Sequence, residues 1–417
     1  MNKLLSLVAA VGLGCFSLSA PARADIVPDL VQKYLGEGRL NEADEKLLAL
    51  AAGATNNADA QLALGMVRTA RAFERLSQAL YRYGFASKTD ALQMFLGSNP
   101  SGELGTNPNP EPITYDQFRA IVTAFVADLA SAEQTLAAVD GRLAKVKVDL
   151  SVARFDWNGD GVVAPQDHIG MMFSDVNEKG EPLPFVVGFD TADAKWMQGY
   201  DNLLMAGAKA LLSHDFSESW DASFGVLFPK AVSTLTAANG ADHGDLSLFG
   251  VSKPAADDFA DYISLIHTIR WPVADKAMWH DVREHLKKVA SLNRETWALI
   301  DKETDDDHEW LPGPKQKDGV LPSMNVTPDR IAAWLAALSK FEAALDGKAL
   351  VPHWRFDKGI NLAKVFDDPR PFDLVLWITG PAAVPYLQDG PVMNQGDWDQ
   401  ITRVFDGDFA SYAFYFN

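Results

Sequence analysis

The chain is poor in cysteine and in positive charge. Its 417 residues include a single cysteine, Cys15, and 37 Lys+Arg stand against 56 Asp+Glu, which gives a formal net charge of −19. Because nucleic-acid phosphates attract basic side chains and repel acidic ones, we expect no nucleic-acid partner. The same sign of charge argues against docking on anionic lipid through general electrostatics.

Long apolar runs and the common catalytic motifs are also missing. No stretch reaches the ~18 to 20 apolar residues that a membrane-spanning helix needs, so we expect no transmembrane segment. The sequence has no G-x-S-x-G motif, no phosphate-cradling loop and no dinucleotide fingerprint. If Cys15 is removed by processing, thiol catalysis, haem attachment through cysteine, iron–sulfur ligation and disulfides are all excluded.

Residues 1–24 read as a secretory signal peptide. Lys3 supplies a short basic start, Leu4 to Leu18 form an apolar and small-residue core, and Ala22-Arg23-Ala24 is a small-x-small cleavage site. We therefore expect a mature chain that starts at Asp25 and is periplasmic or secreted. Lipidation at Cys15 is the alternative, and it is disfavoured because Gly12, three positions ahead, is not aliphatic.

The remaining chain is patterned mainly as helices. Apolar residues recur at helical spacing between Leu62 and Leu80, Thr114 and Gln117 form a capping box, and Asp190 is placed to cap a helix that runs to about His214. Further helices are expected after Pro254, from about Ala274 to Thr304, and from Thr327 to Gly347. Between Lys145 and Phe155 the apolar period changes to two, which indicates a strand.

These patterns predict a mainly α fold, with a short strand before one loop and a small β-containing C-terminal part. The expected regions after the signal peptide are an N-terminal helical region (25–144), a loop region (145–189), a second helical region (190–347) and a C-terminal α/β segment (348–417). Short apolar runs between Pro, Gly and Asp turns mark the last of these. No low-complexity linker separates the regions.

Residues 156–167 (DWNGDGVVAPQD) carry the clearest chemical motif. Oxygen-bearing side chains stand at the first, third, fifth and twelfth positions, a glycine stands at the sixth, and a backbone carbonyl is available at the seventh. Ca²⁺ takes six to eight oxygens, and such a loop wraps them around one point. The segment resembles an EF-hand calcium loop, and the resemblance implies these metal ligands: Asp156, Asn158, Asp160, the carbonyl of Val162, and Asp167.

Two features depart from the EF-hand pattern. Asp167 stands where glutamate is usual, and its shorter side chain weakens two-oxygen coordination of Ca²⁺ and improves the relative standing of Mg²⁺. EF-hands normally pair, yet the only similar segment, 175–180 (DVNEKG), places Lys179 where a carboxylate should be and is expected to form a turn. Val163, at the eighth position, is expected to point inward.

Other clusters of polar side chains are weaker candidates for a metal or catalytic site. His280, Glu284 and His285 have the spacing HxxxEH, which turns the two histidines about 140° apart around a helix, so exposed ion pairs are expected rather than a zinc site. The run Asp305–Glu309 is typical of a solvated helix end, with a second weak cation site as the alternative. Ser213-His214-Asp215 are adjacent in sequence, which is the wrong geometry for a catalytic triad.

The leading hypothesis is an exported, non-enzymatic calcium-binding protein that acts as a scaffold or binding module for an unknown protein or envelope partner. The alternative is a periplasmic hydrolase acting on a polar envelope substrate; it requires a deep pocket where ionisable groups converge. Three segments resemble exported bacterial proteins of unassigned function, a likeness that supplies no residue roles: Ala63 to Gly84, Asn107 to Pro112, and Trp196 to Trp220.

Overall fold

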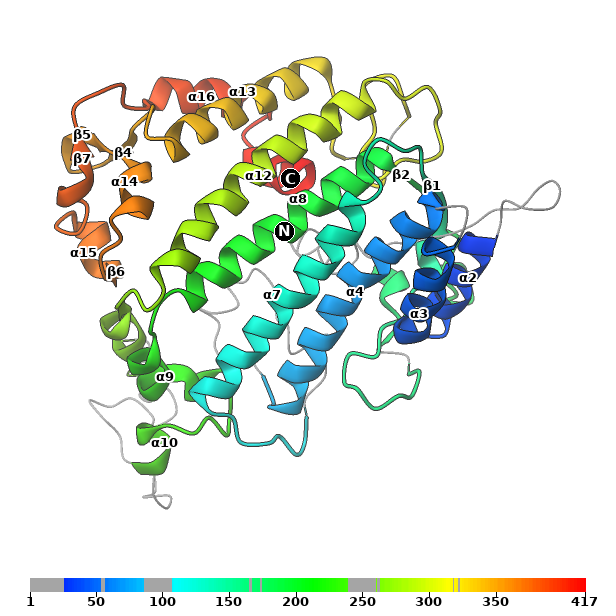
Figure 1. Cartoon of the computed structure of the whole chain (residues 1–417), viewed down its shortest axis with the longest axis horizontal. Coiled ribbons are helices and arrows are strands. Elements are labelled where there is room, and N and C mark those ends of the chain that lie inside the picture. The colour runs from blue at the N-terminus through cyan, green and yellow to red at the C-terminus, as the bar shows by residue number, and fades with distance from the viewer. Residues whose placement is uncertain are drawn as a thin grey trace.

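Four long helices lie side by side at the centre of the computed structural model, in the order α4 (Ala58–Arg82), α7 (Tyr115–Ala137), α8 (Thr191–Leu212) and α12 (Lys276–Ile300) (Figure 1). The structure describes residues 26–53, 57–85, 107–164, 167–172, 175–238, 260, 263–317, 319–321 and 323–417. The mainly α fold expected from the sequence is confirmed. The predicted signal peptide and the start of the helix expected after Pro254 lie outside the described residues.

Local capping defines where these helices begin. Thr114 and Gln117 form the predicted capping box ahead of α7, and Asp190 forms a second capping box with Asp193 ahead of α8. Asn57 accepts hydrogen bonds from two backbone N–H groups at the start of α4. These side chains satisfy backbone donors that the first turn of a helix leaves without an intrahelical partner.

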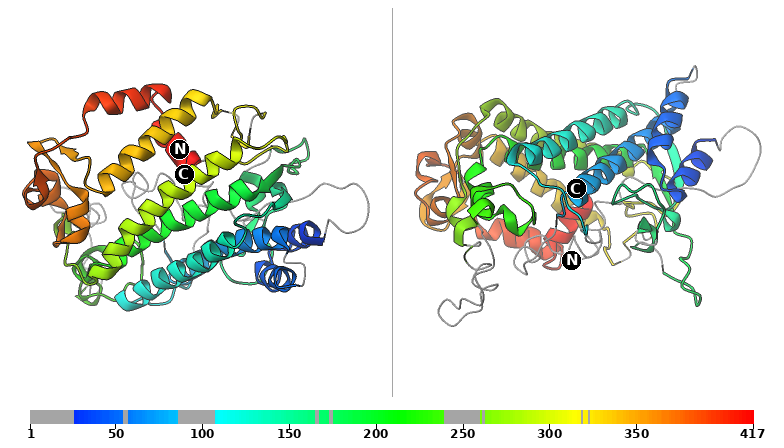
Figure 2. Two further views of the ribbon diagram at one scale, coloured as in Figure 1. Left: turned by 45° about the horizontal axis from the view of Figure 1, so that its top comes forward. Right: turned by 90° about the horizontal axis from the view of Figure 1, so that it is seen from below.

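One end of this helical layer carries α2 (Ile26–Gly36), α3 (Leu40–Ala51) and a two-stranded antiparallel sheet (Figures 1 and 2). Strand β1 (Lys145–Asp149) pairs with β2 (Val186–Asp190), and Val146 lies opposite Phe189. The strand expected over 145–155 is therefore confirmed for its first half, whereas Leu150–Val152 form the 3-10 helix η1. The 36 residues between β1 and β2 contain the EF-hand-like loop.

The opposite end carries the small sheets of the C-terminal part (Figure 2, right). Strands β4 (Val351–His353), β5 (Phe356–Ile360) and β7 (Leu387–Gln388) form one sheet, and β3 (Arg270–Trp271) pairs with β6 (Phe372–Asp373). Short helices fill the rest: α9 (Ser217–Ser223), α10 (Thr234–Ala238), α14 (Leu362–Asp367) and α15 (Leu374–Thr379). The predicted β-containing segment is thus present, although much of the apolar run 372–378 is helical.

Helix α13 (Pro328–Leu345) crosses above α12, and α17 (Phe409–Phe416) lies between them; α16 (Gln395–Val404) runs beside α13 (Figure 2, left). The apolar run 410–416, assigned to the β-containing part by sequence, is this buried helix α17. Trp334 of α13 contacts the rings of Phe409 and Phe416, and Trp297 of α12 contacts Phe416. Contacts between aromatic side chains thus join α12, α17 and α13.

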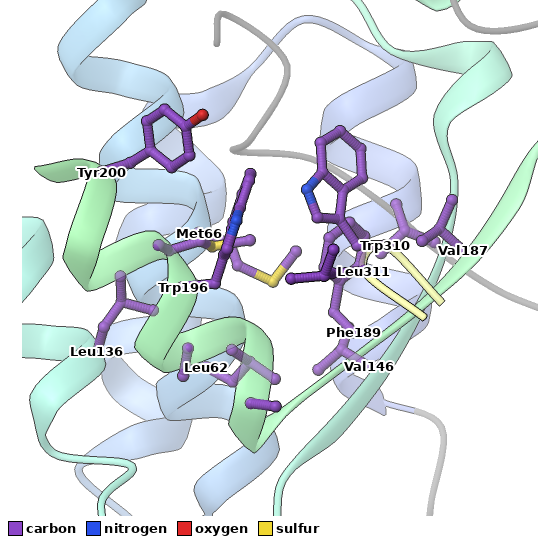
Figure 3. Close-up of a cluster of buried hydrophobic side chains, with 14 of the residues drawn as sticks. Leu62, Met66, Leu136, Val146, Val187, Phe189, Trp196, Tyr200, Trp310 and Leu311 are labelled. Atoms are coloured by element: carbon purple, nitrogen blue, oxygen red, sulfur yellow. The ribbon is translucent and has the colours of Figure 1, made fainter. Parts of the chain in front are cut away.

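The main core lies where α4, α7 and α8 meet the β1–β2 sheet (Figure 3). Trp196 and Trp310 are fully buried there, with ring centroids 5.5 Å apart, and Trp310 stacks on Phe189 of β2. Gly65 of α4 allows α7 to approach closely, because a Cβ at that position would lie 2.4 Å from a methyl carbon of Leu136. The close packing of α4 against α7 therefore accounts for this glycine.

Candidate functional site

The EF-hand-like loop follows β1 without an incoming helix. The chain passes from β1 through η1 and the extended residues 153–155 into the loop, and it leaves through the 3-10 helix η3 (Ile169–Met172). The backbone N–H of Phe155 donates to the carbonyl of Asp167 at 2.8 Å, so the two ends of the loop are held together. Residues 165–166 lie outside the described part.

Asp156 organises the first half of the loop. Its Oδ1 accepts hydrogen bonds from the backbone N–H groups of Gly159 (2.8 Å) and Asp160 (3.2 Å), and its Oδ2 accepts one from Gly161 (3.1 Å). Gly159 and Gly161 have φ of 74° and 69°, a left-handed conformation that side chains with a Cβ rarely adopt. The sixth-position glycine predicted from the motif therefore has the required backbone geometry.

Asn158 and Asp160 continue this network. The Oδ1 of Asn158 accepts from the backbone N–H of Asp160 at 3.1 Å, and its amide donates to Oδ2 of Asp160 at 2.8 Å. The other oxygen of Asp160 accepts from the N–H of Val162 at 2.7 Å. Val163 is 50% exposed, so the expectation that it points inward is wrong; among the described residues no second loop lies alongside to cover it.

Asp167 is the most deeply buried of the five predicted ligands, with 2% of its surface exposed. Its Oδ2 accepts from the N–H of Ala164 at 2.8 Å, whereas its Oδ1 is buried with no hydrogen bond of ordinary geometry among the described residues, although the backbone N–H of Trp157 lies near enough to lower the pKa of the carboxyl. Burial raises the pKa of the Asp167 carboxyl, and the like charges of Asp156 and Asp160 raise it further. A buried carboxylate oxygen without a hydrogen bond destabilises the folded protein unless a proton or a cation compensates its charge.

Three side chains on α4 hold the start of the loop. Gln78 donates to the carbonyl of Asp156 at 2.7 Å, Ser77 donates to the carbonyl of Trp157 at 3.3 Å, and Glu74 accepts from the N–H of Asp156 at 3.1 Å. Glu74 is buried, and that burial raises its pKa to about 7. Sequence analysis missed these anchors, because Glu74 alternates with arginines on what reads as the polar face of α4.

A cavity of about 370 Å³ lies between the loop and the turn that joins α2 to α3. Asp156, Gly161 and Asp167 line one side, and Arg39 lines the other, where it pairs with Glu37 and Glu42. None of the three loop aspartates has an ion pair within the described residues. Nor, in the part of the chain described, do three or more His, Cys, Asp or Glu side chains already converge on one point where an ion could be held.

The residues present nevertheless fit an oxygen-ligated cation. Three carboxylates and an amide oxygen stand on one short loop, the glycine conformations are those that the motif requires, and the buried Oδ1 of Asp167 has no hydrogen bond of ordinary geometry among the described residues. Hard cations such as Ca²⁺ and Mg²⁺ bind such oxygens. Ion binding would have to bring the side-chain oxygens of Asp160 and Asp167 closer to those of Asp156, because these oxygens do not yet converge on one point.

The acidic run Asp305–Glu309 is only in part the solvated helix end that its composition suggests, because Asp305 and Asp306 are exposed whereas Glu309 is buried. It follows the end of α12 and lies along the β1–β2 sheet, where Lys145 pairs with Asp305 and Asp307, and Lys147 pairs with Asp307 at 2.5 Å. Glu309 is buried, and burial raises its pKa. Lysines from β1 therefore already compensate Asp305 and Asp307, and Lys317 pairs with Asp306 at 3.0 Å.

Further carboxyl groups lie behind that run. Burial raises the pKa of Glu303 to about 7, and the neighbouring charge of Asp190 contributes to the rise. Glu303 hydrogen-bonds to Asp190, whose own pKa is raised by burial, and Asp193 beside them is also buried with a raised pKa. These groups are kept neutral in part by their surroundings, and none of them lines the cavity beside the loop.

The histidines do not gather into a site. His285 is half-buried, and its ring bonds to the Oδ1 of Asn202 at 2.8 Å, so the exposed ion pair expected for it is wrong. His280 lies 3.6 Å from Asp367 at the surface. In the Ser213-His214-Asp215 stretch the Oγ of Ser213 lies 3.1 Å from the Nδ1 of His214, which also bonds to the carbonyl of Ala210. Asp215 instead accepts from Tyr115, so none of these bonds joins it to His214 and no triad forms.

His285 does line a polar cavity of about 330 Å³ between α7, α8 and α12, together with Glu133, Lys209, Glu284 and Lys288. Burial lowers the pKa of His285. Lys288 pairs with Glu133 at 2.5 Å, and Lys209 pairs with Asp281 at 3.0 Å, so both lysines of this cavity are already paired with carboxylates. The hydrolase hypothesis has its nearest structural counterpart here.

Comparison with family models, with curated proteins and with solved structures finds no match to this chain. Function must therefore be argued from the residues themselves. Among the described residues no helix combines the length and apolarity needed to cross a membrane.

Proposed function

We propose that this chain is an exported calcium-binding protein whose 156–167 loop holds a structural Ca²⁺, and that it serves as a non-enzymatic scaffold or binding module in the envelope. One observation carries the metal site: the Oδ1 of Asp167 is buried without a hydrogen bond of ordinary geometry, beside two further aspartates for which the described residues supply no ion pair. A divalent cation would satisfy that oxygen and remove the repulsion among the three carboxylates.

The ligands would be Asp156, Asn158, Asp160, the carbonyl of Val162, and Asp167. The aspartate at the twelfth position gives weak binding, in the range of ~10⁻⁵ to 10⁻³ M found in extracellular modules, and lets Mg²⁺ compete. Such affinity suffices only where free calcium is high, which agrees with the export proposed from residues 1–24. The partner is proposed only as an unidentified protein or envelope component.

The ion would stabilise the loop in place rather than trigger a conformational change. Calcium switches work by moving two helices apart, and here the loop enters from β1 and leaves through a 3-10 helix, with both ends already joined by the Phe155–Asp167 hydrogen bond. Binding is therefore expected to stabilise the fold by RT ln(1 + [Ca]/Kd), roughly 1 to 3 kcal/mol at ten to a hundred times Kd. It should expose no new apolar surface.

The test is calorimetric titration of the purified protein with Ca²⁺, alongside thermal unfolding in calcium and in chelator. One site per chain and a higher Tm in calcium are expected, and Asp156→Ala should abolish both. Asp175→Ala, which removes an exposed aspartate just beyond the loop, is the matched control and should leave both unchanged. Identical melting curves in calcium and in chelator would refute the structural role.

A hydrolase remains the second candidate, and the polar cavity around His285 is the place for its chemistry. Both of its lysines are already paired with carboxylates, and within it only His285 shows a shifted pKa. The scaffold proposal is favoured for that reason.

A further inference from the structure

The cavity between the loop and the α2–α3 turn is also lined by a second arginine, Arg154. This side chain is half-buried, and among the described residues its guanidinium takes part in no ion pair and no hydrogen bond. Its Cβ lies 3.7 Å from the position that a Cβ on Gly38 would take, so it stands against the α2–α3 turn. The chain has 56 acidic residues against 37 basic ones, so the free guanidinium does not reflect a shortage of carboxylates.

The carboxylates that line this cavity are engaged elsewhere. Arg39 pairs with Glu37 at 2.9 Å and with Glu42 at 2.8 Å. The aspartates of the loop accept backbone N–H groups of the loop itself. Arg154 and the loop aspartates thus line one cavity of about 370 Å³ without pairing across it, which leaves room for a ligand that contacts both.

The ligand set of the loop is also incomplete for Ca²⁺. The ion takes six to eight oxygens, and the five predicted ligands supply one each when the short side chain of Asp167 binds through a single oxygen. The ninth position of the motif is Ala164, whose side chain has no oxygen. Since Asp156 and Asp167 line the cavity, an oxygen from a molecule inside it can complete the set.

The charge and the apolar lining of the cavity indicate which molecule fits. Three loop carboxylates and the guanidinium of Arg154 sum to −2, which repels an anion, and a bound divalent cation brings this sum to zero. The Arg39 pairs are exposed and therefore more strongly screened. Val162 and Val163 also line the cavity and are 63% and 50% exposed, so an organic anion covers apolar surface that an inorganic one would leave in water.

We propose that this cavity binds a small organic carboxylate, which pairs with the guanidinium of Arg154 and donates one oxygen to the calcium site. Guanidinium and carboxylate groups form strong charge-assisted hydrogen bonds, frequently two in parallel. The cavity holds about 12 water-sized groups at ~30 Å³ each, which sets the size of the ligand. This inference rests on the calcium site proposed above and names the class of molecule which that site takes.

The charge requirement is tested by calorimetric titration with phenylacetate and with phenylacetamide, which match in size and differ in charge. In calcium, phenylacetate should bind once per chain with a Kd of about 1 mM or tighter, and phenylacetamide at least about tenfold more weakly. Phenylacetate should also bind at least about tenfold more weakly in calcium-free buffer, and it should tighten calcium binding by that same factor. Equal affinity for the two compounds, or phenylacetate binding that is absent or indifferent to calcium, would overturn the proposal.

The role of the arginine is tested by Arg154→Gln, which should weaken phenylacetate binding in calcium by at least about tenfold. Calcium itself should bind this variant at least as tightly as the parent, because a nearby cation has been removed. Arg270→Gln, which removes an exposed arginine on β3 at the opposite end of the molecule, is the matched control and should bind both like the parent. Undiminished phenylacetate binding in Arg154→Gln would refute the assignment.

Two outcomes in the parent protein separate this inference from the function on which it rests. Calcium binding without phenylacetate binding would refute the carboxylate site and leave the metal site standing. Absence of calcium binding would refute both.

Discussion

Two groups of carboxylates flank the β1–β2 sheet, and they are compensated in different ways. The group around Glu303 and the run Asp305–Glu309 receives Lys145 and Lys147 from β1, and its buried members have raised pKa values that favour the neutral form. In the part of the chain that the structure describes, the group in the loop has no ion pair, and it retains on Asp167 a buried oxygen without a hydrogen bond of ordinary geometry. An acidic cluster points to a cation only when the protein has not already supplied one.

The largest effect should follow from removing the lysine of the compensated group. Lys145→Met leaves Asp305 and Asp307 with less positive charge beside them and should destabilise the fold by about 2 kcal/mol, since Lys145 is about one-third exposed and its pairs are partly screened. Urea unfolding measures the loss. Calcium should not restore it, and Lys358→Met, which breaks an exposed pair with Asp389, should cost less than about 0.5 kcal/mol.

A smaller, pH-dependent effect is expected at Glu303. Its folded pKa of about 7 lies above the ordinary value of 4.5, so the folded state binds this proton more tightly than the unfolded state does. The resulting stability is fully present below pH 4.5 and is lost as the pH rises through 7. Glu303→Gln should flatten this decline and add about 1 to 2 kcal/mol near pH 8, a figure reduced for partial exposure.

Urea unfolding between pH 4.5 and 8 checks this prediction over the window that the shift defines. Glu178→Gln, at an exposed turn, is the matched control and should parallel the parent protein. A decline as steep in Glu303→Gln as in the parent would assign the pH dependence to other carboxyl groups.

The smallest effect, and the sharpest for the comparison, concerns Asp167. Asp167→Asn removes the buried charge and its repulsion by Asp156 and Asp160, so in chelator it should stabilise the protein by about 1 kcal/mol. In calcium the order should reverse, because the variant lacks a carboxylate ligand. Thermal unfolding of both proteins under both conditions measures this, and a variant less stable than the parent in chelator would show that the carboxylate is already compensated.

The sequence predicted the features that depend on local chemistry. The capping box at Thr114, the helix cap at Asp190, the strand at 145–149 and the left-handed glycine at 161 follow from residues within one turn of each other. What it missed depends on distant partners: Glu74 reads as a surface residue, yet it is buried against Asp156, 82 residues away. The lysine partners of Asp305 and the cavity between the loop and the α2–α3 turn likewise depend on residues far apart along the chain, so the sequence alone could not predict them.

The core also imposes an order on folding. Trp196 donates its indole N–H to the carbonyl of Tyr415, which lies 219 residues further along the chain, and α17 fills the space between α12 and α13. Contacts this distant carry a large loop-closure cost and form late. The aromatic centre of α8 thus stays incomplete until α17 has been synthesised, so a chain leaving the ribosome cannot close its core early. For a protein proposed to cross a membrane before it folds, that delay keeps the chain in a form that can be threaded.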